Sequence, residues 1–167
     1  QETVLTLDGL PVTGINSNLT GGVDVTGAKK RRENRKIALK GINKVGDFDI
    51  DAKTAQQMLS RLNSSSVSNA DVIKRLLNAK EIVDRPNDRW IIDFSIERDE
   101  TKVMRYEAPY DYLKNHVFPT RSQNARATRA KYWWLFGEPV PRLRPLLANL
   151  TRYIVTPMVS KHRIFVF

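Results

Sequence analysis

The clearest periodic pattern in the chain is an apolar stripe within residues 48–62. Ala55, Met58, Leu59 and Leu62 recur at the i, i+3, i+4, i+7 spacing of one helical face. Asp51 stands just before the stripe, at the position of a helix N-cap. The pattern predicts an amphipathic helix over this stretch.

Further helices are predicted from the same spacing. One begins near Asn69 and buries Val72, Ile73, Leu76 and Leu77. Residues 98–117 are predicted to be helical, with a break at Pro109 and an end at Pro119. A basic helix is predicted over residues 124–135. Another starts at Pro141 or Pro145, with its apolar face at Leu143, Leu146, Leu147 and Leu150.

Three stretches have the pattern of strands. Residues 3–7 alternate and lead into a turn built on Asp8, Gly9 and Pro11. Residues 90–94 alternate with Trp90 on one face and Ile91 on the other, which predicts a central or near-central strand. The β-branched and aromatic residues at the end predict strands at 152–159 and 163–167, or one bent strand interrupted near Pro157. Without regular βαβ alternation, the fold class is α+β, with a mixed or antiparallel twisted sheet packed with several helices.

The charge of the chain favours a polyanionic partner. Its 28 Lys and Arg against 18 Asp and Glu give a net charge of +10. A membrane partner is not expected, because no apolar run approaches the roughly 20 residues that cross a bilayer. The absence of cysteine excludes disulfides and cysteine-based chemistry. No signal peptide pattern is present, so the cytoplasm is the expected compartment.

Candidate catalytic residues are few. Asp93 followed by Glu100-Thr-Lys102 resembles the carboxylate and Glu-x-Lys arrangement of magnesium nucleases, but the charged sequence around it favours a solvated turn. His116 and His162 have no metal-ligand spacing, and no glycine-rich nucleotide motif occurs. We therefore predict no catalytic, metal-binding or cofactor-binding residue in this chain.

Basic residues instead suggest a DNA-binding surface. Beyond residue 101, twelve Lys and Arg stand against three Asp and Glu. Phosphate contacts are predicted in two segments, and contacts near the bases at the end of the chain. The predicted DNA-binding residues are Lys29, Lys30, Arg31, Arg32, Arg35, Lys36, Arg121, Gln123, Asn124, Arg126, Arg129, Lys131, Arg152, Lys161, His162 and Arg163.

Alternatives remain for several of these positions. Residues 29–36 also fit a solvated helix or loop face. Gln123 and Asn124 could equally cap the following helix, and His162 could be an ordinary surface residue. The adjacent Trp133 and Trp134 are predicted to anchor the basic helix to the domain by partial burial against the central strand and the helix that carries Leu143, Leu146 and Leu147. The alternative for this pair is stacking on an exposed base.

Three segments carry a resemblance to a known family. They are "RPNDRWIIDFS", "YEAPYDYLKNHVFPTRSQNARATRAKYWWLFGEPVPRLRPLL" and "RYIVTPMVSKHRIFVF". Together with "LDGLPVTGINSNLT", "GDFDIDAKTAQQML" and "SNADVIKRLLN", they resemble the target-recognition region of large bacterial adenine-specific DNA methyltransferases, including the MmeI-like restriction-modification enzymes. The resemblance covers nearly the whole chain, and "YWWLFGEPVPRLRPLL" is its most specific piece.

The resemblance implies one target-recognition domain, residues 1–167, that reads duplex DNA in the major groove. The methyltransferase core is expected before residue 1, where it would bind S-adenosylmethionine and methylate adenine N6. Further recognition residues are expected after Phe167, so the chain is expected to be a noncatalytic fragment. Two other functions stay open: a magnesium-dependent nuclease or complete nucleic-acid enzyme, and a basic protein-protein scaffold.

Overall fold

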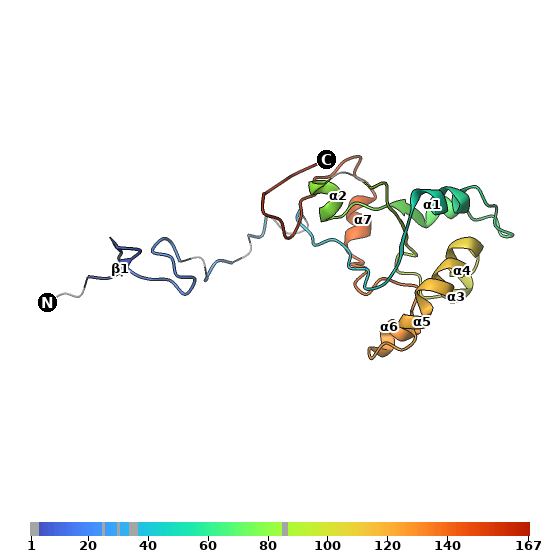
Figure 1. The fold of residues 1–167 in the computed structure, drawn as a ribbon, viewed down its shortest axis with the longest axis horizontal. Helices are drawn as coiled ribbons and strands as arrows, with labels where there is room; N and C mark the ends of the chain where they lie inside the picture. Colours follow the sequence, from blue (N-terminus) through green and yellow to red (C-terminus); the bar gives the residue numbers. More distant parts are fainter. Residues whose placement is uncertain (1–3, 25, 30, 34–36, 85–86) are drawn as a thin grey trace. The chain divides into compact units, whose positions relative to one another are not determined.

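The computed structural model describes residues 4–24, 26–29, 31–33, 37–84 and 87–167, and the chain divides into two compact units, Gln1–Ala38 and Leu39–Phe167. In the first unit, β1 (Thr6–Leu7) pairs antiparallel with β2 (Leu10–Pro11) (Figure 1). Asp8 and Gly9 form the turn between them, with φ of 51° and 78°. A two-residue hairpin turn of this type needs positive φ at both positions, which Asp and Gly tolerate. The predicted turn at Asp8 and Gly9 is confirmed, whereas the described strand is limited to Thr6–Leu7 and Pro11 lies in β2 instead of in the turn.

The second unit contains a three-stranded antiparallel sheet. It is formed by β3 (Asp49–Ile50), β4 (Ile73–Arg75) and β5 (Trp90–Ile92), with β5 in the centre. Ile50 lies opposite Trp90, and Ile73 lies opposite Ile92. Ile91 and Ile92 point to opposite faces, and both are buried, so the sheet is covered on both sides. The predicted central strand is confirmed.

The predicted helix after Asp51 is also confirmed. α1 (Ala52–Leu59) begins where the Asp51 carboxylate accepts a hydrogen bond from the backbone amide of Thr54 at 2.7 Å. Ala55 and Met58 on its apolar stripe are buried in the core. The helix ends earlier than the pattern suggests, and Leu62 is 96% exposed.

The helix predicted from Asn69 is wrong. A short 3-10 turn, η1 (Asn69–Asp71), leads directly into β4, which pairs with β5. The buried Asn69 amide donates to the backbone oxygens of Met58 at 2.8 Å and Arg61 at 3.2 Å, so it satisfies one carbonyl in the last turn of α1 and one just after the helix. This tether places the β-branched Val72 and Ile73 beside the sheet, where they extend it. The next helix, α2 (Ala79–Val83), is capped by the Asn78 side chain.

The helical region after β5 is broken at a different point from the one predicted. α3 (Glu100–Val103) and α4 (Glu107–His116) are separated by residues 104–106, whereas Pro109 lies in the first turn of α4. A first-turn amide has no intrahelical acceptor, so proline costs no hydrogen bond there. Pro119 likewise lies in the first turn of α5 (Phe118–Arg121) and does not end the region.

The last part of the chain has less regular structure than predicted. α6 (Ala127–Lys131) is shorter than the predicted helix over 124–135, and α7 (Leu143–Leu147) lies within the predicted final helix. Instead of two strands, residues 152–167 contain a single antiparallel bridge between Val155 and Val166. The described residues form an α+β arrangement with two small antiparallel sheets and seven α-helices. None of these helices has the length and apolar character needed to cross a bilayer.

Candidate nucleic-acid interface

The tryptophan pair lies inside the second unit. Trp133 and Trp134 follow α6 in a turn and are only 4% and 3% exposed. The Trp133 ring packs against Tyr110 of α4 and Phe118 of α5, at centroid distances of 5.5 and 5.1 Å. Because α6 ends before the pair, both adjacent side chains can turn inward, which neither a helix nor a strand would allow on one face. The predicted anchoring by burial is confirmed, but the ring contacts of Trp133 are with α4 and α5 instead of with the predicted leucine helix; stacking on an exposed base is wrong for these buried rings.

The cations of the α6 segment have no carboxylate partner among the described residues. Arg126 is the N-cap of α6, Arg129 lies within it and Lys131 ends it. Arg126 and Lys131 are exposed, and Arg129 is half-buried. In the described part of the chain, no carboxylate oxygen lies within 4.0 Å of any of the three. Their charge is therefore not neutralised by any carboxylate that the structure describes and can serve phosphate binding.

The Tyr132 ring contacts a further cation, Arg98, which the sequence analysis did not identify. The Lys131 ammonium lies 5.3 Å from the centre of the Tyr132 ring, and the Arg98 guanidinium lies 5.2 Å from it. Both distances fall within the range of a cation-π contact. Arg98 and Tyr132 are far apart in the sequence, and no local pattern predicts their approach. Arg98 thus joins Lys131 on the same surface.

The prediction for Arg121 is wrong. Its side chain is 2% exposed, and its guanidinium donates to the backbone oxygens of Val45 at 2.9 Å and Leu135 at 2.6 Å. Arg121 ends the short helix α5, which packs its last residue into the core of the unit. Burial, with a smaller contribution from the charge of Arg129, lowers the pKa of Arg121 below its ordinary value. In the conformation that the structure shows, Arg121 therefore presents no exposed guanidinium donor to a phosphate on the molecular surface.

The polar residues between α5 and α6 are accessible. Gln123 is exposed and Asn124 is half-buried. The Asn124 side chain accepts a hydrogen bond from the backbone amide of Arg126 at 3.0 Å. This is an Asx-type turn that leads into α6, whose N-cap is Arg126 itself. Asn124 thus shapes the approach to α6, while its role in reading adenine stays a prediction.

The basic segment 29–36 belongs to the first unit. Lys29, Arg31 and Arg32 are exposed. Lys30, Arg35 and Lys36, also predicted to contact DNA, lie outside the described residues. The contribution of this segment to a DNA surface stays a prediction.

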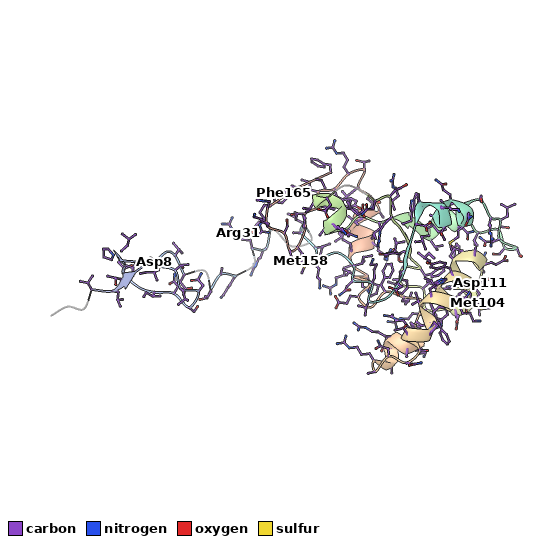
Figure 2. The ribbon with its side chains drawn as sticks, viewed as in Figure 1. Asp8, Arg31, Met104, Asp111, Met158 and Phe165 are labelled. Atoms are coloured by element: carbon purple, nitrogen blue, oxygen red, sulfur yellow. The ribbon has the colours of Figure 1, made fainter. Side chains whose placement is uncertain are left out.

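The C-terminal segment carries the remaining predicted cations. Arg152, Lys161, His162 and Arg163 are exposed, and the structure describes no carboxylate ion pair for any of them. Apolar side chains accompany them: Met158 and Phe165 are 73% and 66% exposed (Figure 2). Figure 1 shows this segment and α6 on different sides of the Leu39–Phe167 unit. The two segments that carry these cations are therefore apart from one another within that unit.

The nuclease arrangement is not assembled. Asp93 accepts from Arg144 at 2.8 Å in a half-buried ion pair, while Glu100 accepts from the Tyr110 hydroxyl at 2.8 Å. Lys102 pairs with Glu97 at 3.5 Å. Among the residues that the structure describes, no three His, Asp or Glu side chains are close enough to hold one metal ion. The three candidate residues thus have separate structural partners.

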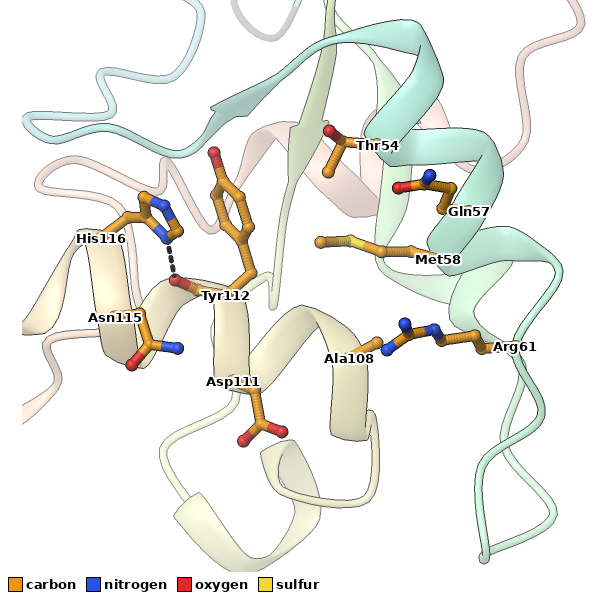
Figure 3. Close-up of a pocket in the computed structure, with 9 residues that line it drawn as sticks. All are labelled: Thr54, Gln57, Met58, Arg61, Ala108, Asp111, Tyr112, Asn115 and His116. Carbon is orange, nitrogen blue, oxygen red and sulfur yellow. Dashed lines mark hydrogen bonds between the residues drawn. The ribbon is translucent and has the colours of Figure 1, made fainter.

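A groove of about 220 Å³ lies between α1 and α4 (Figure 3). Its polar lining includes Gln57, Arg61 and Asp111. The rings of Tyr112 and His116 stack at 4.0 Å, and His116 Nδ1 lies 2.8 Å from the Tyr112 backbone oxygen. Because a carbonyl only accepts, Nδ1 carries the proton in this contact. The mixed charge of the lining favours no particular ligand, and the groove includes none of the predicted DNA-binding residues.

Comparison with known proteins gives no information about the function of this chain. No protein-family model matches the chain, and neither the curated proteins nor the solved structures contain a significant match.

Proposed function

We propose that this chain recognises duplex DNA and positions it for methyl transfer to adenine N6 by a methyltransferase domain of the same protein. The observation that carries the proposal is the set of accessible cations without carboxylate partners around α6, with Arg126, Arg129 and Lys131 at its centre. The sequence resemblance to target-recognition regions supplies the link to adenine methylation. S-adenosylmethionine would bind to the methyltransferase domain.

Two kinds of contact divide the task in this proposal. Cations around α6 bind backbone phosphates, which supplies affinity and fixes the position of the duplex. Side chains of the C-terminal segment, such as His162 and Arg163, contact base edges in the major groove and supply sequence preference. The 4.1 Å approach of the Arg152 guanidinium to the Phe167 ring centre holds that cation close to the end of the segment.

The rival functions make different demands on the structure. A nuclease needs carboxylates that converge on one metal ion, whereas Asp93 and Glu100 have separate partners. A protein-protein scaffold needs no unpaired cations, and its binding would depend little on salt. DNA binding releases counterions, so its affinity falls steeply as salt rises. Salt dependence therefore separates the DNA proposal from the scaffold.

The test measures binding of a short fluorescent duplex by anisotropy over a series of salt concentrations. The triple variant Arg126→Gln, Arg129→Gln, Lys131→Gln should weaken binding and flatten the log-log salt dependence by roughly 0.9 for each lost phosphate contact. A control with the same loss of charge is Lys53→Gln, Lys74→Gln, Arg105→Gln, which changes exposed cations on other segments. Equal losses in both variants, or binding that ignores salt, would contradict the proposal.

The methylation step needs its own measurement. The full-length protein that contains this chain is expressed in a host, and methylated adenines are mapped across the genome. A single modified sequence motif that disappears on deletion of the gene is the expected result. If the chain binds DNA in a salt-dependent way but no adenine is methylated, the DNA-recognition role is kept and the link to methyl transfer is contradicted.

A further inference from the structure

Arg121 is a buried cation, and the described part of the chain supplies no counter-charge for it. Two of its guanidinium nitrogens donate to the backbone oxygens of Val45 and Leu135, while its Nε is buried and has no partner among the residues that the structure describes. Among the described residues, no carboxylate oxygen lies within 4.0 Å of it. Backbone carbonyls offset part of the cost of burial but supply no negative charge. The ring centre of Phe48, 5.9 Å from the guanidinium carbon, adds a cation-π contact, so the guanidinium retains a free Nε donor and has no anionic partner among the described residues.

A second cation lies close to the same place. A Cβ built on Gly137 would be 2.7 Å from the Cβ of Val45 and 3.4 Å from the guanidinium carbon of Arg129. Arg129 thus borders the residue that covers Arg121. Two arginines near one another in a poorly solvated place repel, unless an anion lies between or beside them. The local charge favours a negatively charged ligand.

A pocket of about 320 Å³ adjoins Arg121. Thr120 of α5 and Asn124 of the connection between α5 and α6 line the same pocket and carry hydrogen-bond donors. The volume is large enough for a tetrahedral oxyanion, and the three side chains together provide several donors. Asp47 also lines the pocket and is exposed. Its carboxylate would repel a bound anion, so removal of this charge should strengthen anion binding to the pocket.

The cover of the guanidinium is strained. Val45 has a φ of 52°, in the left-handed region that β-branched residues rarely occupy, and Gly46 follows with a φ of 154°. The Val45 oxygen is one of the two acceptors of Arg121. Movement of this segment would relieve the strain and release a guanidinium donor toward the pocket. Backbone strain of this kind tends to occur at ligand-binding segments.

We propose that this pocket binds an oxyanion of the phosphate class, with Arg121 as its buried cationic ligand and Thr120 and Asn124 as further donors. The Val45–Gly46 segment moves to admit the anion. The inference does not depend on the proposed function, because the pocket would bind a free phosphate ion whether or not the chain binds DNA.

The test follows the Arg121 Nε–H resonance by NMR while inorganic phosphate is added, with sodium chloride at the same ionic strength as the reference. A saturable shift with phosphate and none with chloride is expected. Asp47→Asn removes the repelling charge and should tighten phosphate binding, on the order of fivefold. Asn124→Ala should weaken it. Asp111→Asn, which removes an exposed carboxylate from the other groove, is the matched control and should change nothing.

The proposal is overturned if phosphate and chloride act alike, or if Asp47→Asn and Asp111→Asn give the same affinity as the unchanged chain. These variants alter accessible side chains, so the test does not require the removal of Arg121 from the core. Competition between phosphate and duplex DNA at constant ionic strength identifies a backbone phosphate as the ligand. Independent binding identifies a free anion. If the chain binds DNA but not phosphate, only the phosphate-pocket proposal is contradicted. If it binds phosphate but not DNA, only the DNA-recognition proposal is contradicted.

Discussion

The indole Nε1 of Trp134 donates a hydrogen bond to the backbone oxygen of Glu97 at 2.8 Å. The bond joins the turn after α6 to the connection between β5 and α3, 37 positions earlier in the sequence. It fixes the α6 segment, with its cations, to the body of the second unit. Trp90 provides a contrast, because its buried Nε1 has no partner among the described groups.

Replacement of each indole by phenyl separates the hydrogen bond from the loss of volume. Trp134→Phe leaves the Glu97 oxygen unpaired and should lower the free energy of unfolding by about 1–3 kcal/mol. Trp90→Phe removes a similar volume but no hydrogen bond, so its cost should be smaller. Urea unfolding of both variants measures the difference. Equal costs would show that the Trp134 bond contributes no net stability.

Stability should fall in acid because two helix caps are carboxylates. The backbone hydrogen bond from Thr54 lowers the pKa of Asp51, and the hydroxyl hydrogen bond from Thr101 lowers the pKa of Asp99. A pKa below its unfolded value adds stability above that value, and the stability is lost as pH falls through the folded pKa. The free energy of unfolding should therefore decrease as pH falls from about 5 to about 2.

The double variant Asp51→Asn, Asp99→Asn isolates this effect. Asparagine keeps an acceptor at the N-cap but does not titrate, so the pH dependence of unfolding should become flatter. Asp111→Asn, on the exposed face of α4, is the control and should leave the pH dependence nearly unchanged. Urea midpoints measured from pH 7 to pH 3 decide between these outcomes. An unchanged slope in the double variant would assign acid sensitivity to other groups.

Gly137 and Val45 are predicted to be coupled. A Cβ at position 137 would lie 2.5 Å from Cγ2 of Val45, so Gly137→Ala should cost about 1–3 kcal/mol through overpacking. Gly41→Ala, where a Cβ meets nothing within 4 Å, should be close to neutral. Val45→Gly removes both the clash and the left-handed strain, so Gly137→Ala should cost less in that background. Thermal unfolding of the unchanged chain, Gly137→Ala, Val45→Gly and the double variant gives the coupling energy. Additive effects of the two substitutions would contradict the coupling.

The C-terminal cations should act on sequence preference. If His162 and Arg163 contact bases, His162→Ala and Arg163→Gln should reduce discrimination between duplexes in the full-length protein by about 1–3 kcal/mol per contact. The α6 triple variant should instead weaken binding to all duplexes alike. Competition binding with a library of duplexes distinguishes the two patterns. Uniform weakening by both sets would assign the C-terminal cations to the phosphate backbone.

The sequence pattern predicted correctly those turns, caps and strands whose geometry depends on residues close together in the chain. The Asp8-Gly9 turn, the Asp51 cap and the alternation at Trp90 each contain the residue types that their geometry needs. Residues 69–77 could not be assigned in this way, because paired apolar residues in "VIKRLL" fit a helix or a strand. The strand forms because Asn69 is tethered to α1 and β5 offers a free edge.

The candidate DNA surface was predictable only as a set of charged residues. The sequence identifies Arg121 and Arg126 as equivalent basic residues a short distance apart. The fold buries the first and exposes the second, because the acceptor for Arg121 at Val45 is 76 positions away. The contact of Arg98 with Tyr132 has the same origin. Burial of a long polar side chain depends on distant acceptors, and no local pattern reports them.

By itself, the sequence determined the α+β class, the start of α1, the central strand and the strongly basic character of the chain, because capping, alternation and net charge are properties of near neighbours. Only the tertiary structure decided that Asn69 leads into a strand, that both tryptophans turn inward and that Arg121 leaves the surface. Each of these outcomes depends on contacts between segments far apart in the chain, which supply burial and hydrogen-bond partners that local residues cannot.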